Sequence, residues 1–213
     1  MWLSVLMSLL TGYMLGNLNG AVSMSTLLGK DDIRNHGSGN AGLTNFMRRF
    51  GPASGLLVMG IDMLKAVVAC VVGKLLLEPH GYGQEGLMLG ALAVSLGHDF
   101  PALLGFHGGK GVLCGVTVAL VADWRCGLLV LGVFALLLWL TRYVSLSSIL
   151  GALTFVIVFP ILHWEKPFVW ICGAFLGLLI IFMHRSNISR LLKGTEKKAT
   201  FSQFRKKKKP ETK

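Results

Sequence analysis

Three short segments rich in glycine and polar residues interrupt an otherwise apolar sequence, and the first has the composition of a phosphate-binding loop. It reads GSGNAGLTN and is followed by two arginines. Closely spaced glycines let several backbone N–H groups converge on one anion, and a nearby guanidinium adds positive charge. No G-K-[ST] ending marks it as a Walker A loop, and a flexible connection between helices is the alternative. The candidate phosphate ligands are Gly37, Ser38, Gly39, Asn40, Thr44, Asn45 and Arg48.

The second segment combines a histidine motif with a lysine set among glycines. It reads GHDFP from Gly97 and FHGGKGV from Phe106. Lys110 stands at the start of an apolar run, so its ammonium and the N–H groups of a helix N-terminus can face the same anion. Gly108 and Gly109 are candidate phosphate ligands beside it. His98 is a candidate acid, base or hydrogen-bond donor, with a structural histidine at a helix end as the alternative.

The third segment, HRSNISRLLKGTE, begins at His184, directly after the last apolar run. On a helix, Asn187 and Arg190 are three residues apart and share a face with His184, so they can face the other two segments together. Asn187 is a candidate catalytic residue and Arg190 a candidate phosphate ligand. A basic helix that contacts lipid head groups is the alternative.

The elements that must position these segments are membrane-spanning helices. Of the 213 residues, 53% are hydrophobic and 15% charged, with mean hydropathy +0.64, whereas a soluble domain has about 25% charged residues. A bilayer accommodates such a chain at about 20 residues per span. We predict an all-α integral membrane protein with seven transmembrane helices, of which the fourth is the shortest. Their ranges are 2–28, 53–77, 86–105, 112–122, 127–140, 146–162 and 168–183.

The basic residues predict the orientation of these helices. A net charge of +11 would suggest nucleic-acid binding in a soluble protein. However, with the N-terminus outside, most of the 21 Lys and Arg fall on the inner side, and the outer loops receive only Arg125 and Lys166. Positive charge in short loops marks the cytoplasmic side. We therefore predict a cytoplasmic C-terminus, no nucleic-acid partner, a membrane domain over 1–196 and a basic cytoplasmic tail over 197–213 that contacts membrane lipids.

Four polar residues lie inside the predicted spans. Asn17, Asn19, Asp62 and Lys65 would be costly against lipid, so they should face the protein interior. Asp62 and Lys65 are spaced i, i+3 and can pair on one helix face. We interpret them as a structural ion pair that supports the site.

Together the three segments resemble the bacterial acyl-phosphate:glycerol-3-phosphate acyltransferase family, of the PlsY type. The family patterns GSGNxGxTN with a following Arg, GHxxP with FxGGKGV, and NIxRLxxGxE are matched in this order over nearly the whole chain. The Asp62-x-x-Lys65 pair also resembles a family feature. The chain departs from the usual family residues at Ala41, Leu43, Ala66, His107, Leu113 and Cys114.

The resemblance implies transfer of a fatty acyl group from acyl phosphate to the 1-hydroxyl of glycerol 3-phosphate at the cytoplasmic face, without metal or cofactor. Arg48 and Lys110 would hold the phosphate groups, and His98 and Asn187 would orient the attacking hydroxyl or the carbonyl. Ser38 would bind phosphate rather than act as a nucleophile. Whether His98 or a substrate phosphate takes the proton stays open, and no protein partner is predicted.

A transporter for a phosphorylated or anionic solute is the alternative function. Broken helices with glycine-rich turns are common in transporters. Polar residues of a transport path should lie at mid-membrane in two matching halves, whereas here they are predicted at one face and no internal repeat is present.

Overall fold

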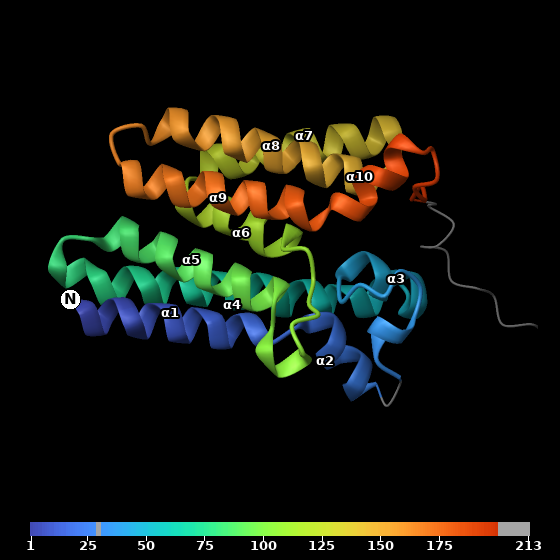
Figure 1. Ribbon diagram of the computed structural model, residues 1–213, viewed down its shortest axis with the longest axis horizontal. Coiled ribbons are helices and arrows are strands. Elements are labelled where there is room, and N and C mark those ends of the chain that lie inside the picture. Colours follow the sequence, from blue (N-terminus) through green and yellow to red (C-terminus); the bar gives the residue numbers. More distant parts are fainter. Residues whose placement is uncertain (29–30, 200–213) are drawn as a thin grey trace, which may run out of the picture.

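The computed structural model describes residues 1–28 and 31–199, and all regular secondary structure in these residues is helical (Figure 1). Three one-turn 3₁₀ helices at Ile33–Asn35, Glu78–His80 and Ala102–Leu104 lie in the connections. The α-helices are α1 Trp2–Asn17, α2 Gly20–Leu27, α3 Leu43–Phe50, α4 Pro52–Leu77, α5 Gly83–Asp99, α6 Val112–Ala122, α7 Trp124–Thr141, α8 Val144–Leu162, α9 Pro167–Met183 and α10 Arg185–Leu192.

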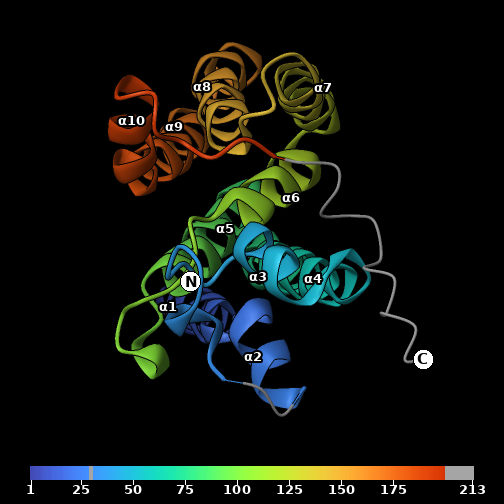
Figure 2. The same cartoon turned by 90° about the vertical axis from the view of Figure 1, so that its right-hand side faces the viewer.

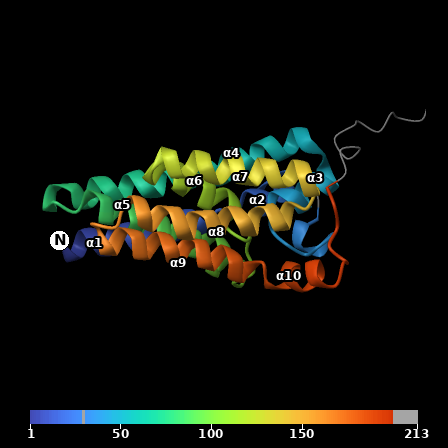
Figure 3. The same cartoon turned by 90° about the horizontal axis from the view of Figure 1, so that it is seen from above.

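The long helices form two groups with α6 between them. Helices α1, α4 and α5 pack against one another, and α8 packs against both α7 and α9. Helix α6 contacts α4 and α5 on one side and α7, α8 and α9 on the other. Figure 2 shows the two groups end-on, and Figure 3 shows that their long axes run nearly parallel. The largest buried apolar cluster, which includes Met88, Val118, Phe155 and Leu176, joins the two groups.

Small residues allow the closest helix contact in the first group. A Cβ at Gly90 would overlap the carbonyl oxygen of Ala69, and one at Gly86 would overlap that of Gly73. Helix pairs in membranes approach closely where glycine and alanine face each other, because lipid gives no hydrophobic drive for larger side chains to associate. The Gly86-x-x-x-Gly90 spacing therefore determines how α5 lies on α4.

The seven predicted apolar segments all correspond to helices, but their lengths differ from seven full spans. Four helical segments are long and apolar enough to cross a membrane: 52–80, 83–104, 124–141 and 144–162. Two bent pairs of helices are long and apolar enough only when each pair is taken together, α1 with α2 at 44° and α9 with α10 at 54°. Helix α6 has 11 residues, about 17 Å, which is short of a hydrocarbon core of about 30 Å.

The single span predicted for residues 2–28 is broken at Leu18 and Asn19. Asn19 begins α2 by accepting a hydrogen bond from the N–H of Val22 with its side chain. At the break, Lys65 Nζ donates to the carbonyl of Leu18 at 2.5 Å, and the N–H of Gly20 donates to Asp62 at 3.1 Å. These bonds satisfy backbone groups that an interrupted helix leaves free, which is what a break inside a membrane requires.

The three polar segments gather at one end of the helix bundle. In Figure 1, helix α3 and helix α10 lie at the right, opposite the N-terminus, and the loop before α6 lies between them and the middle of the bundle. The other end holds the α4–α5 connection, where His80 hydrogen-bonds Ser4, and the α8–α9 connection, where Lys166 donates to Gln84. The co-location predicted from the sequence is therefore present in the fold. The basic tail beyond Ala199 and Lys30 lie outside the described residues.

Candidate functional site

A chain of hydrogen bonds links the second polar segment to the third. Lys110 Nζ donates to Asn187 Oδ1 at 2.5 Å, and Asn187 Nδ2 donates to Glu196 Oε1 at 2.7 Å. The other carboxylate oxygen of Glu196 accepts from Arg190 Nε at 2.6 Å. Asn187 is buried and lies in the middle of this series of hydrogen bonds. The bonds fix the orientation of its amide, because the lysine can only donate and the carboxylate can only accept.

The charges around Lys110 are predominantly positive. Burial lowers the pKa of Lys110, and the charges of Arg190, Arg185 and Arg48 lower it further, against the opposing charge of Glu196. Burial alone would raise the pKa of Glu196, but hydrogen bonds that include those from Asn187 and Arg190 hold it below its ordinary value. One carboxylate thus stands among four cations. Such a group of cations is electrostatically suited to an anion.

Several backbone groups of the first polar segment bond to the side chain of Asn45. Asn45 is 4% exposed, and its Oδ1 accepts from the N–H of Ser38 at 3.1 Å. Its Nδ2 donates to the carbonyls of Ile33, His36 and Asn40 at 2.9–3.2 Å. Gly37 has φ +62°, and a Cβ there would overlap Asn45 Oδ1. Asn45 therefore shapes the loop with its side-chain amide, and the N–H groups of Gly39 and Gly42 bond to carbonyls within the same loop.

The glycines of the second segment pack against the end of α5. A Cβ at Gly108 would overlap the carbonyl oxygen of His98, and one at Gly109 would overlap the imidazole ring of His98. The N–H of Gly109 donates to that same carbonyl at 3.0 Å. The motif alone predicts that both glycines are phosphate ligands. The structure shows that close approach to His98 requires glycine at both positions.

Replacing Gly109 by alanine should therefore lower acyltransferase activity by at least about tenfold, because overpacking of this kind costs about 1–3 kcal/mol and displaces Lys110 or His98. Turnover by purified protein in detergent measures the effect. Gly60→Ala is the matched control, since Gly60 lies on α4 with open space around it. Native turnover in Gly109→Ala would show that the loop tolerates the displacement.

His98 belongs to a buried polar group at the break between α1 and α2. Lys65 Nζ lies 2.9 Å from Asp62 Oδ1 and 2.9 Å from His98 Nδ1. All three side chains are nearly inaccessible to solvent, with exposed fractions of 1%, 4% and 4% for Asp62, Lys65 and His98. The predicted ion pair is thus present, and it contacts a candidate catalytic residue directly. Spacing along the sequence could indicate the ion pair but not this contact.

The structure brings together some candidate residues more closely than others. Lys110, Asn187 and Arg190 are joined through Glu196, whereas Arg48 reaches them only through its charge and is itself exposed. Within the described residues, no hydrogen bond joins Ser38 or Thr44 to the other two segments, and both are exposed. The first segment is therefore tied to the second through Arg34 and not through its candidate phosphate ligands.

Three residues with a part in the site were missed as candidates in the sequence analysis. Arg34 is held by Asp32 at 2.8 Å and donates to the carbonyl of Leu104 at 2.7 Å, which ties the first loop to the second. Glu196 and Arg185 surround Lys110 electrostatically. The spacing of Asp32 and Arg34, two positions apart, is a weak signal of a turn closed by an ion pair. Glu196 is part of the third motif, which is the signal that could have identified it.

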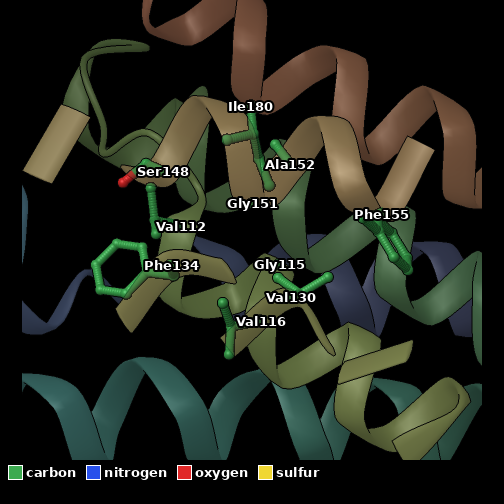
Figure 4. A pocket seen from close by; sticks show the side chains of 10 residues that line it. All are labelled: Val112, Gly115, Val116, Val130, Phe134, Ser148, Gly151, Ala152, Phe155 and Ile180. Carbon is green, nitrogen blue, oxygen red and sulfur yellow. The ribbon is translucent and has the colours of Figure 1, made fainter. Parts of the chain in front are cut away.

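A small apolar cavity lies beside the start of α6 (Figure 4). Its volume of about 20 Å³ is close to that of one water-sized group, so it is a packing gap and not a formed substrate site. The cavity is lined by Val112, Gly115, Val116, Val130, Phe134, Ser148, Gly151, Ala152, Phe155 and Ile180.

Over residues 1–28 and 31–199, no group of three His, Cys, Asp or Glu side chains could hold a metal ion.

The fold and the site define a class: a multi-helical protein with a cationic, glycine-rich polar site at one end of an apolar bundle. A model of the glycerol-3-phosphate acyltransferase family matches residues 6–194. The glycerol-3-phosphate acyltransferase of Thermoanaerobacter pseudethanolicus is 42% identical over 186 residues, which cover 87% of this chain and 91% of that protein. The protein of the same name from Trichormus variabilis is 38% identical over 213 residues, covering 93% of each.

Two solved structures that this chain resembles come from a protein with the same activity in its name. A crystal structure of PlsY, an integral membrane glycerol 3-phosphate acyltransferase in its glycerol 3-phosphate form, matches with a TM-score of 0.84 and 32% identity over 93% of this chain and 97% of that one. Its lysophosphatidic acid form matches with a TM-score of 0.80, again at 32% identity, over 94% and 98% of the two chains. The chain belongs to the glycerol-3-phosphate acyltransferase family, and it is a multi-pass integral membrane enzyme of phospholipid synthesis. The predicted family, fold class and enzyme class are confirmed.

Proposed function

We propose that this enzyme takes its acyl group from acyl phosphate and transfers it to the sn-1 hydroxyl of glycerol 3-phosphate, giving lysophosphatidic acid and inorganic phosphate. Both substrates carry a phosphate group, and the cluster of Lys110 with the three arginines around it is the observation that carries the proposal. The related PlsY structures hold glycerol 3-phosphate and lysophosphatidic acid, which supports these as substrate and product here. Family membership leaves the transporter alternative without support.

Positioning and charge neutralisation suffice for this reaction, because an acyl phosphate is a mixed anhydride with a good leaving group. The substrate hydroxyl oxygen forms an ester bond to the acyl carbon, and the bond from that carbon to the phosphate oxygen breaks. The electron pair leaves with phosphate, and the hydroxyl proton is finally carried by the inorganic phosphate released. No covalent intermediate on Ser38 is needed.

The candidate residues divide into three roles. Lys110, Arg48 and Arg190 neutralise phosphate charge, and the loop of Gly37 and Gly39 completes the cradle with the side chains of Ser38, Asn40 and Thr44. Asn45, Gly108 and Gly109 hold the two loops in shape. His98 and Asn187 orient the reacting groups. The residue types and their gathering at one end of the bundle support this division.

One assay tests the donor. Purified protein in lipid or detergent receives glycerol 3-phosphate together with acyl phosphate, acyl-coenzyme A or acyl-carrier protein in separate reactions, and lysophosphatidic acid and phosphate release are followed. We expect product with acyl phosphate, and release of one phosphate for each lysophosphatidic acid formed. Product from a thioester alone would contradict the proposed donor and leave the acyltransferase activity intact.

We further propose that the site lies at the cytoplasmic face of a bacterial inner membrane. The clustered Lys and Arg at the same end as the site support this orientation, because short basic loops stay in the cytoplasm. A reporter that is active only in the cytoplasm should be active when fused after Lys213. Activity of a periplasmic reporter at that fusion would reverse the orientation.

A further inference from the structure

The contact between Lys65 and His98 determines which ring nitrogen of His98 carries its proton. Lys65 Nζ lies 2.9 Å from His98 Nδ1 and 2.9 Å from Asp62 Oδ1. It also lies within hydrogen-bonding distance of the carbonyls of Gly16 and Leu18. A carboxylate and two carbonyls around one nitrogen are the environment of an ammonium ion, which has three N–H donors and no acceptor.

An ammonium next to Nδ1 makes that nitrogen an acceptor. A histidine with a proton on Nδ1, whether neutral or doubly protonated, would direct N–H against N–H at 2.9 Å. The neutral ring with its proton on Nε2 is the form that fits, because each neutral imidazole has one donor and one acceptor nitrogen. His98 therefore presents an Nε2–H group on the side of the ring away from Lys65.

The Nε2 atom is free to donate. It faces Gly109, the residue before Lys110, and among the described residues none hydrogen-bonds to it. The enclosed side-chain polar atoms that lack a partner among the described residues belong to Ser8, Asp99, Ser95 and Ser145, and His98 Nε2 is not one of them. A donor beside the lysine and its glycine loop is placed for a substrate oxygen.

We infer that His98 is a hydrogen-bond donor to substrate through Nε2–H, not the base that removes the hydroxyl proton, and that Lys65 is the positioning residue that holds it in this form. A base needs an unprotonated nitrogen facing the hydroxyl, and here the unprotonated nitrogen faces Lys65. Asp62 acts one step further back, by holding the Lys65 ammonium. This inference rests on the placement of His98 in the site proposed above, and it assigns the role that the sequence analysis left open.

The tautomer itself can be measured in the native enzyme. Histidine-selective ¹⁵N labelling in detergent micelles, with the His98 signals identified by their loss in His98→Gln, distinguishes a protonated from a bare ring nitrogen. We expect a proton on Nε2 and a bare Nδ1 in native protein. A bare Nε2, or a ring protonated on both nitrogens, would overturn the inference whatever the donor assay shows.

Two substitutions at His98 separate a donor from a base. Glutamine retains an N–H donor near the position of Nε2 and has no basic nitrogen. We expect His98→Gln to retain a kcat about tenfold or more above that of His98→Ala, with similar KM values, since a hydrogen bond to a charged group is worth about that factor. Equal inactivity of the two variants would make His98 a base. Native turnover in His98→Ala would remove His98 from the site and with it the proposed role.

A double-variant comparison tests Lys65. Lys65→Met should lower kcat by about tenfold or more in otherwise native protein and by little in the His98→Ala background, because nothing is left there to orient. A purely structural role predicts the same loss in both backgrounds, which would contradict the positioning role. Where Lys65→Met does not fold, the ¹⁵N signals of the native enzyme and the His98 pair of variants decide the question.

Discussion

Replacing Lys110 by alanine should reduce kcat/KM by at least about a hundredfold while the protein remains folded, since removing one donor aimed at developing charge costs about 10²–10³-fold. Lys110 joins two of the three polar segments through its bond to Asn187, and three arginines act on it electrostatically. Gly108, Gly109 and Gly111 position Lys110, because they let the loop around it turn and pack against the end of α5. Initial rates with varied glycerol 3-phosphate and acyl phosphate measure the loss.

Lys193→Ala is the matched control for this experiment. Lys193 is an exposed lysine at the end of α10, close in sequence to the site but outside its hydrogen-bond chain. We expect it to change turnover by less than about twofold, as exposed charges contribute little. Comparable losses from Lys110→Ala and Lys193→Ala would mean that general positive charge, and not a defined phosphate site, supports the reaction.

Replacing Asp62 by alanine should destabilise the protein by about 3–5 kcal/mol, because it leaves the buried Lys65 charge without its partner. Asp62 Oδ1 lies 2.9 Å from Lys65 Nζ and also accepts from the N–H of Gly20 at the break between α1 and α2. The variant therefore loses bonds that hold the chain at the break between α1 and α2, against which the end of α5 packs. Thermal unfolding in detergent, compared with native protein, measures the change.

The double variant Asp62→Ala, Lys65→Met is the informative comparison. Removing both charges leaves no uncompensated ion, so the double variant should unfold at a higher temperature than Asp62→Ala alone. A double variant that is less stable than Asp62→Ala would show that Lys65 stabilises the fold mainly through its bonds to the carbonyls of Gly16 and Leu18 rather than through the ion pair.

The class of fold could be predicted from the sequence because hydropathy is a local property. The segment predicted over 112–122 coincides with α6, and Arg142 ends α7 in the left-handed conformation, with φ +62°, between the predicted segments 127–140 and 146–162. The break at Leu18 and Asn19 was not predictable, because residues 2–28 are uniformly uncharged and the groups that hold the break come from α4.

Composition and motif spacing predicted an all-helical membrane protein with three glycine-rich polar motifs, since short stretches of sequence carry that information. What each motif residue contacts depends on how the helices pack. Asn45 shapes its own loop, Gly109 makes room for the His98 ring, and Lys65 holds the ring nitrogen that faces away from Gly109. Lys65 and His98 are 33 positions apart, and Lys110 and Asn187 are 77 apart. Bonds over such separations depend on how whole helices pack, which spacing within one motif does not specify.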